Sequence, residues 1–115
     1  PDRVVLISDT MRAAGMTDGR YDLGGQEVTV KGPLATLADG TIAGSVTDLM
    51  ACMRNAVSFG IPLADAVQAA AVNPAQAVGV FDRVGSLEPG KRANLVVLDQ
   101  GLEIKAVFFK GRQVV

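Results

Sequence analysis

The stretch that decides the fold is Arg-Val-Val-Leu-Ile-Ser-Asp, at residues 3–9. Its unbroken apolar run predicts a strand over residues 4–8 that is buried on both faces, as strands of parallel sheets are. Such a strand needs neighbouring strands and covering helices, and the two residues before it cannot supply them. The strand leads into the carboxylate of Asp9, and catalytic groups lie at the C-terminal ends of barrel strands. The stretch therefore predicts a piece of an α/β enzyme.

The composition is that of a globular chain of 115 residues, 49% of them hydrophobic, which is long enough to bury a core. Its 11 basic and 12 acidic side chains give a net charge of -1 and form no basic stripe. We therefore expect neither nucleic acid nor a membrane surface as a partner. Cys52 is the sole cysteine, which fits a reducing compartment. With no signal-peptide pattern and no apolar run of membrane-spanning length, the expected location is the cytoplasm.

The chain contains no histidine, and this limits the chemistry it can perform alone. A histidine-based catalytic triad and the usual zinc ligand sets cannot be assembled without it. We therefore expect any metal site to need residues from elsewhere.

A long excursion, residues 10–45, separates the first strand from the first expected helix. Residues 23–32 resemble a short hairpin arm, and the pair Asp39-Gly40 marks a second turn before residues 41–45. Excursions of this length in compact folds are usually functional or disordered.

Three helix starts follow the excursion. Ser45 and Asp48 form a capping-box-like pair ahead of a stripe of apolar residues at helical spacing. Pro62 suits the first turn of a second, alanine-rich helix. Asn73, followed by proline, is expected to cap a third helix. The expected ends of these helices are the glycines Gly60 and Gly79.

The last third of the chain changes period and predicts an antiparallel β-unit. Residues 85–91 form a turn-rich connector that we interpret as structural. Strands are expected at residues 93–99, 104–109 and 112–115. Three short strands make a poor sheet alone, so this unit too is expected to pair with a segment outside the chain.

Two places could carry chemistry. Asp9 fits a general base or a metal ligand, and equally an Asx-turn with the residues that follow it. Residues 41–45 would place backbone N–H groups at a helix N-terminus, where they could hold an anion or a polar ligand, or serve as an ordinary capping loop. Gly44 in this segment permits close backbone approach. Cys52 is interpreted as a small core residue.

Several stretches resemble known enzymes. Residues 73–79, Asn-Pro-Ala-Gln-Ala-Val-Gly, with Gly-Ser-Leu-Glu-Pro-Gly-Lys-Arg-Ala-Asn-Leu-Val-Val-Leu-Asp at residues 85–99, resemble the C-terminal signature of the amidohydrolase superfamily. Residues 6–15, 40–45 and 53–55 are similar to the N-acetylglucosamine-6-phosphate deacetylases within it. The resemblance covers essentially the whole chain, but only about the last third of such an enzyme.

The resemblance implies an α/β architecture, a (β/α)8 barrel with a small β-sandwich built from both chain ends. Residues 4–8 would be the eighth barrel strand. Residues 1–79 would form the C-terminal end of the barrel, and residues 80–115 would contribute strands to the sandwich.

The resemblance also implies a reaction, hydrolysis of the acetamide of N-acetyl-D-glucosamine 6-phosphate to D-glucosamine 6-phosphate and acetate. A divalent metal such as zinc would activate water, and Asp9 would take the water's proton and pass it to the leaving amine. The backbone of Ile42, Ala43 and Gly44 would contact the sugar. The family's metal ligands match no residue here, so we expect the chain alone to be inactive and the complete enzyme to be a homodimer. The alternatives are a hydrolase of a cyclic amide or another N-acyl amine, and a non-catalytic fragment that needs its missing N-terminal region.

Overall fold

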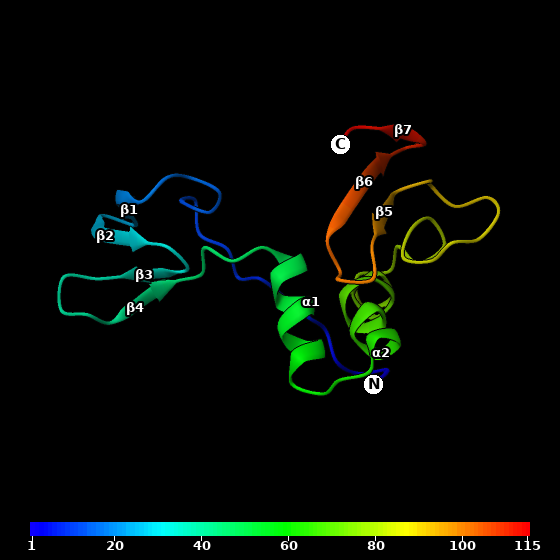
Figure 1. Cartoon of the computed structure of the whole chain (residues 1–115), viewed down its shortest axis with the longest axis horizontal. Helices are drawn as coiled ribbons and strands as arrows, with labels where there is room; N and C mark the ends of the chain where they lie inside the picture. Colours follow the sequence, from blue (N-terminus) through cyan, green and yellow to red (C-terminus); the bar gives the residue numbers. More distant parts are fainter. The chain divides into compact units, whose positions relative to one another are not determined.

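The chain divides into two compact units in the computed structural model, which describes residues 1–115. One unit is residues 6–55, and the other combines residues 1–5 with residues 56–115. No helix is both long and apolar enough to cross a membrane. The elements in chain order are β1 (Gly19–Leu23), β2 (Gln26–Lys31), β3 (Leu34–Thr36), β4 (Ile42–Gly44), α1 (Leu49–Ser58), α2 (Leu63–Val67), the π-helical η1 (Gln68–Val72), α3 (Asn73–Ala77), β5 (Leu95–Leu98), β6 (Ile104–Phe109) and β7 (Arg112–Gln113) (Figure 1).

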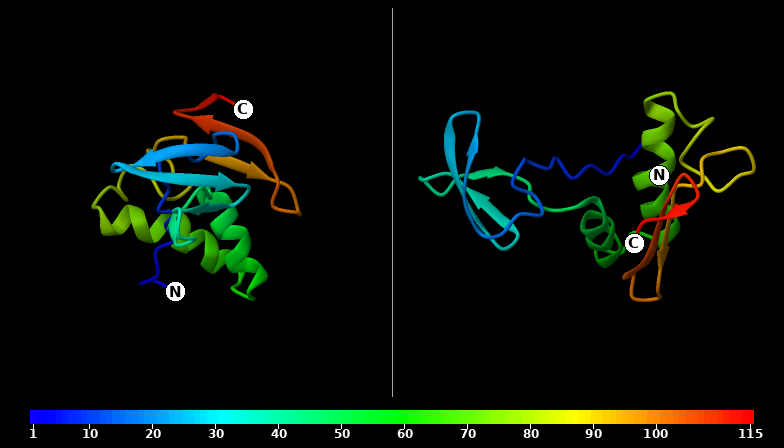
Figure 2. Two further views of the ribbon diagram at one scale, coloured as in Figure 1. Left: turned by 90° about the vertical axis from the view of Figure 1, so that its left-hand side faces the viewer. Right: turned by 90° about the horizontal axis from the view of Figure 1, so that it is seen from above.

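The unit of residues 6–55 contains a four-stranded antiparallel sheet in the order β1-β2-β3-β4 (Figure 2). Gly24 and Gly25, with φ of 62° and 87°, make the tight turn between β1 and β2. Two positive φ values are what a two-residue hairpin turn requires, so the predicted hairpin arm is confirmed. The buried residues Met11, Ala13, Val28, Val30 and Ala35 form the core of this unit.

The turn at Asp39-Gly40 is also confirmed, and it joins β3 to β4. Gly40 has a φ of 85°, and the Thr41 N–H donates a hydrogen bond of 2.9 Å to Asp39 Oδ1. Hydrogen bonds from Thr41 lower the pKa of Asp39, because they favour the charged carboxylate.

Helix α1 is capped by Asp48 rather than by Ser45. The Ala51 N–H donates a hydrogen bond of 2.7 Å to Asp48 Oδ1, at the position of a normal N-cap. The Ser45 Oγ instead accepts a hydrogen bond of 3.1 Å from the Thr47 N–H. The predicted capping box is therefore wrong, because the helix begins at Leu49, too far along the chain for Ser45 to reach its first turn.

Residues 63–77 form one continuous helical stretch instead of two helices. Asn73 has helical dihedral angles, φ -60° and ψ -44°, and its N–H is bonded to the Gln68 carbonyl five residues earlier. The predicted capping role of Asn73 is therefore wrong, because α3 begins at Asn73 itself and continues η1 without a break. This wider turn lies next to Pro74, whose ring nitrogen has no proton to donate within the helix.

The end of the stretch at Gly79 is confirmed. Gly79 has a φ of 72°, and its N–H donates to the Gln76 carbonyl at 3.1 Å. The Val80 N–H donates to the Ala75 carbonyl at 2.8 Å. This pair of bonds is the Schellman arrangement that closes many helices.

The Asn73 side chain binds the N-terminal segment and does not cap a helix. It is 3% exposed, and its Nδ2 donates hydrogen bonds of 2.7 Å to the Pro1 carbonyl and 2.6 Å to the Val4 carbonyl. Its Oδ1 accepts a hydrogen bond of 3.2 Å from Gln68 Nε2. The amide therefore ties residues 1–4 to the helical stretch.

The predicted strand at residues 4–8 is absent. These residues pair with no other segment, and Val4 and Ile7 are 53% and 70% exposed. A strand forms only when its backbone is hydrogen-bonded to a neighbouring strand, and no segment of this chain lies beside residues 4–8 to make those bonds.

The tail forms the expected antiparallel unit, a three-stranded sheet in the order β5-β6-β7. Lys110 and Gly111, both with positive φ, make the turn between β6 and β7. The Lys110 N–H donates a hydrogen bond of 2.9 Å to Asn94 Oδ1, which fixes the turn against the start of β5.

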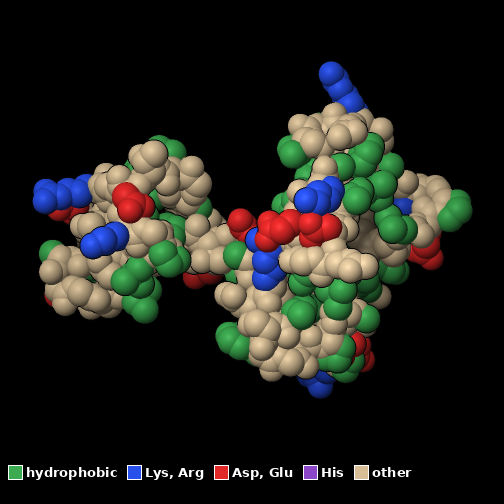
Figure 3. Space-filling view, viewed as in Figure 1, with side chains coloured by type: hydrophobic (Ala, Val, Ile, Leu, Met, Phe, Trp, Pro, Cys, Tyr) green, Lys and Arg blue, Asp and Glu red, His purple; other side chains and the backbone are tan.

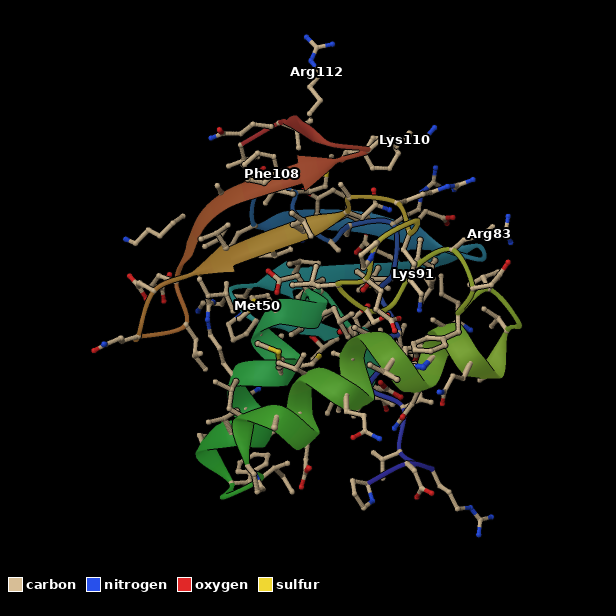
Figure 4. The ribbon with its side chains drawn as sticks, turned by 90° about the vertical axis from the view of Figure 1, so that its right-hand side faces the viewer. Met50, Arg83, Lys91, Phe108, Lys110 and Arg112 are labelled. Atoms are coloured by element: carbon tan, nitrogen blue, oxygen red, sulfur yellow. The ribbon has the colours of Figure 1, made fainter.

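The connector at residues 85–91 is held by Lys91, whose side chain is only 10% exposed (Figure 4). Its Nζ lies 2.7 Å from Glu88 Oε2, 2.6 Å from Ser86 Oγ and 3.5 Å from the centroid of the Phe81 ring. The hydrogen bonds from Lys91 and Ser86 lower the pKa of Glu88. These contacts agree with the structural interpretation of the connector.

Candidate functional site

Asp9 lies in an exposed stretch of backbone, and its carboxylate has no hydrogen-bond or ion-pair partner within the chain. Its φ of 49° falls in the left-handed region, which aspartate tolerates better than most residues. An Asx-turn would need the Met11 N–H, but that group donates a hydrogen bond of 2.8 Å to the Ser45 carbonyl. The turn-forming interpretation of Asp9 is therefore wrong, and its carboxylate is free to act on a ligand.

An isolated parallel bridge joins Thr10 to Ser45. Asp9 immediately precedes Thr10, and Gly44 immediately precedes Ser45, so the parallel direction puts Asp9 and Gly44 on the same side of the bridge. Neighbouring strands lie about 4.8 Å apart. The structure therefore brings together Asp9 and the segment of Ile42, Ala43 and Gly44, which the sequence analysis proposed separately.

Residues 42–44 form strand β4 instead of the start of a helix. Ile42 pairs with Thr36 and Gly44 pairs with Ala35 of β3, and α1 begins only at Leu49. The expectation of backbone N–H groups at a helix N-terminus is therefore wrong, because residues 42–44 pair with β3 and are extended. β4 is the last strand of its sheet, so one edge of its backbone faces away from β3 and can hydrogen-bond a ligand.

Glycine is required at position 44 mainly because of the backbone conformation there, and less because a side chain would lack room. Its φ is 152°, outside the range that side chains usually adopt, while an added Cβ would meet Met11 at an ordinary 3.6 Å. Ala43 packs against the core of the unit, and Ile42 is 71% exposed. The segment therefore offers ligands a fixed backbone and one exposed apolar side chain.

Sequence reasoning missed the residues that connect these two segments. The Thr10 hydroxyl donates a hydrogen bond of 3.2 Å to the Thr47 carbonyl and is also hydrogen-bonded to the Ser8 hydroxyl. Nothing in the local pattern distinguishes Thr10 from other threonines, because its partner lies 37 residues away.

Other features lie outside this site. Cys52 is half-buried, and its Sγ is 3.8 Å from the Ile7 carbonyl. A depression on the β1–β2 hairpin is lined by residues around the Arg20–Glu27 pair and contains none of the candidate residues. Acidic and basic side chains are interspersed on the face drawn in Figure 3. No group of three or more His, Cys, Asp or Glu residues is placed to hold a metal ion.

The chain is similar to known amidohydrolases. The model of the amidohydrolase family matches residues 12–114. A putative N-acetylgalactosamine-6-phosphate deacetylase of Escherichia coli K12 is 45% identical over 112 residues, which are 96% of this chain and 67% of that protein. The N-acetylglucosamine-6-phosphate deacetylase of Bacillus subtilis is 39% identical over 110 residues, or 95% of this chain and 28% of that protein.

The chain is also similar to solved structures of such deacetylases. The N-acetyl-D-glucosamine-6-phosphate deacetylase of Mycobacterium smegmatis in complex with N-acetyl-D-glucosamine-6-phosphate superposes with a TM-score of 0.87 at 42% identity, over 99% of this chain and 31% of that one. The enzyme of Pasteurella multocida gives a TM-score of 0.91 at 28% identity, over 97% of this chain and 30% of that one. The chain thus combines helices and strands that match part of these enzymes, and it spans about a third of their length.

Proposed function

The chain belongs to the amidohydrolase family, and on this premise we propose that it is the C-terminal part of an amino-sugar phosphate deacetylase. The reaction is hydrolysis of the acetamide of N-acetyl-D-glucosamine 6-phosphate to D-glucosamine 6-phosphate and acetate. The observation that carries the proposal is the Thr10–Ser45 bridge, which brings the backbone of Asp9, with its unpartnered carboxylate, beside the end of the edge strand β4. The relative from M. smegmatis, which holds this sugar phosphate, matches the chain over both segments.

Asp9 is the general base of this proposal. Its carboxylate takes a proton from the attacking water as the water oxygen bonds to the acetamide carbon. It then gives that proton to the amine nitrogen as the C–N bond breaks, so one group serves as base and then as acid. The absence of protein partners on this carboxylate supports the role, because no group of the chain occupies the oxygens that would bind the attacking water.

The backbone of Ile42, Ala43 and Gly44 is proposed to hold the sugar. Peptide groups on the outer edge of β4 point away from β3 and can donate and accept hydrogen bonds with sugar hydroxyls. Gly44 has a positive φ, a backbone conformation that is unfavourable for residues with a side chain, and this conformation shapes the edge of β4.

A divalent metal such as zinc does not fit the residues of this chain. The chain has no histidine, and no three acidic or cysteine side chains converge, whereas such metals usually need three or four protein ligands. The proposal therefore places the metal ligands outside the chain and predicts that the chain alone has no deacetylase activity.

The barrel assignment is part of the same proposal. Residues 1–79 would complete the barrel and residues 80–115 would contribute to a β-sandwich, in a homodimeric complete enzyme. The exposure of Val4 and Ile7, both large and apolar, supports a barrel strand at residues 4–8 whose neighbours come from elsewhere.

The test is Asp9→Asn in the full-length protein. Asparagine tolerates the left-handed backbone of Asp9 and removes only the proton acceptor, so we expect kcat to fall about 10²–10⁴-fold. Asp82→Asn, at a side chain that is 75% exposed, is the matched control and should keep wild-type turnover. Near-normal turnover by Asp9→Asn would eliminate the general-base role.

A second candidate substrate is N-acetyl-D-galactosamine 6-phosphate, which differs at one sugar carbon. The two relatives named for that sugar are 45% identical to the chain, against 39–40% for the two relatives next in identity, which are named for the glucosamine sugar. Measuring kcat/KM for both sugar phosphates, a cyclic amide and another N-acyl amine decides the substrate. A preference for either of the last two would reject the amino-sugar assignment.

A further inference from the structure

The Thr10 side chain joins residues 8–10 to Thr47 within the unit of residues 6–55. Its hydroxyl is hydrogen-bonded to the Ser8 hydroxyl and, at 3.2 Å, to the Thr47 carbonyl. A hydroxyl has one proton, and a carbonyl can only accept. The Thr10 proton therefore goes to Thr47, and the proton between Thr10 and Ser8 comes from Ser8.

Asp9 lies between the two hydrogen-bonded residues in the sequence. Ser8 and Thr10 flank it in sequence, and their side chains bond to each other across it. In an extended strand, side chains two residues apart point to the same face but stand about 6.5–7 Å apart. The φ of 49° at Asp9 bends the chain and lets the two hydroxyls meet. The hydrogen bond and the left-handed conformation of Asp9 thus stabilise each other.

The same side chain fixes Asp9 relative to β4. The backbone of Thr10 bridges to Ser45, and its hydroxyl reaches Thr47 two residues further on. Next to the bridge, Met11 Sδ and Cβ lie 3.6 Å from where a Gly44 Cβ would be. Thr10 and Met11, which follow Asp9, are therefore held to Gly44, Ser45 and Thr47 by both backbone and side-chain contacts.

We propose that Thr10 is a positioning residue for the deacetylation, because its hydroxyl sets the place of the Asp9 carboxylate beside the sugar-binding edge of β4. This inference rests on the proposed function. Thr10 and Asp9 are both exposed, so the hydrogen bonds of Thr10 contribute little to overall stability. A displacement of about 1 Å in a reacting group can nevertheless cost about 10²-fold in rate, so the role should appear in turnover.

The experiment compares variants of the full-length protein. Thr10→Val keeps the shape of the side chain and removes the hydroxyl, and Thr10→Ser keeps the hydroxyl. Thr29→Val makes the same exchange at an exposed position on β2. The readouts are kcat and KM with both sugar phosphates, and the melting temperature.

We expect Thr10→Val to lower kcat at least about 10-fold, with KM within about two-fold and a melting temperature near that of the wild type. Thr10→Ser should recover kcat to within about three-fold of the wild type, and Thr29→Val should match it. A purely structural role would lower the melting temperature and would not separate kcat from KM.

Three results would overturn the inference: unchanged kcat in Thr10→Val, a loss that Thr10→Ser does not restore, or a loss that follows the melting temperature. These three results can be told apart from a failure of the proposed function. A wild-type protein that turns over neither sugar phosphate refutes both, whereas an active wild type with a fully active Thr10→Val refutes only the positioning role.

Discussion

Substituting Gly85 by alanine probes the close packing of the connector against the helical stretch. A Cβ at this position would lie 2.7 Å from the Ala75 Cβ, 3.1 Å from the Ala71 carbonyl oxygen and 3.1 Å from Phe81 Cδ2. The first distance is shorter than real Cβ contacts allow, and two of the three atoms belong to the helical stretch. The connector therefore cannot keep its place against the helix once Gly85 gains a methyl group.

The expected cost has two parts. Gly85 has a φ of 98°, and holding alanine in such a sparsely populated region costs about 1–3 kcal/mol. Forcing a methyl group into a filled space costs about another 1–3 kcal/mol. Gly90, with a φ of 91° and no atom within 4 Å of its Cβ position, carries only the first cost. We expect Gly85→Ala to destabilise the fold by about 4 kcal/mol and Gly90→Ala by about 2 kcal/mol.

The assay is urea unfolding of the full-length protein followed by circular dichroism, with both variants measured beside the wild type. The difference between the two variants isolates the steric contribution, since their backbone contributions are similar. Equal destabilisation of the two, within about 0.5 kcal/mol, would show that the connector moves away from the helix freely, and the packing argument would then fail.

Two further predictions concern hydrogen-bonded side chains. Asn73→Ala should lower the free energy of unfolding, measured in urea, by about 2–3 kcal/mol, because two backbone carbonyls lose their donor. Gln76→Ala, at an exposed position of α3, is the control and should change the free energy of unfolding by less than about 0.5 kcal/mol. Equal effects of the two substitutions would contradict the role of Asn73. Since the pKa of Glu88 is lowered by its hydrogen bond from Lys91, its stabilisation is present above the pKa of the unfolded state and is lost as the pH falls through the folded pKa. An NMR titration should show this lowered pKa and its rise in Lys91→Met, and an unchanged Glu88 titration in that variant would rule out the cause assigned to it.

Local signals predicted several elements correctly. The hairpin arm within residues 23–32, the turn at Asp39-Gly40 and the strands of the tail appear where turn chemistry and period indicated them, and Gly79 ends its helix as expected. These features depend on residues close together in sequence. The family resemblance has the same local origin, since the stretches that carry it are contiguous.

The errors arose where a distant partner competes for a residue. Asn73 has the pattern of a helix cap, but its amide bonds carbonyls near the start of the chain. Residues 42–44 precede a helix, yet pairing with β3 makes them a strand. Capping and turn preferences are worth about 1 kcal/mol, so a few tertiary hydrogen bonds override them.

The sequence by itself determined the apolar run that ends at Asp9, the hairpin arm of residues 23–32, the turn at Asp39-Gly40, the antiparallel tail and the family. Only the tertiary structure decided that residues 4–8 remain unpaired in this chain and that Asp9 makes no Asx-turn. It also decided that Thr10, the residue after Asp9, contacts Ser45 and Thr47 just beyond β4. The physical reason is the range of the interactions. Periodicity and turn residues act within a few positions, whereas strand pairing and the site itself depend on which distant backbone groups are available to bond.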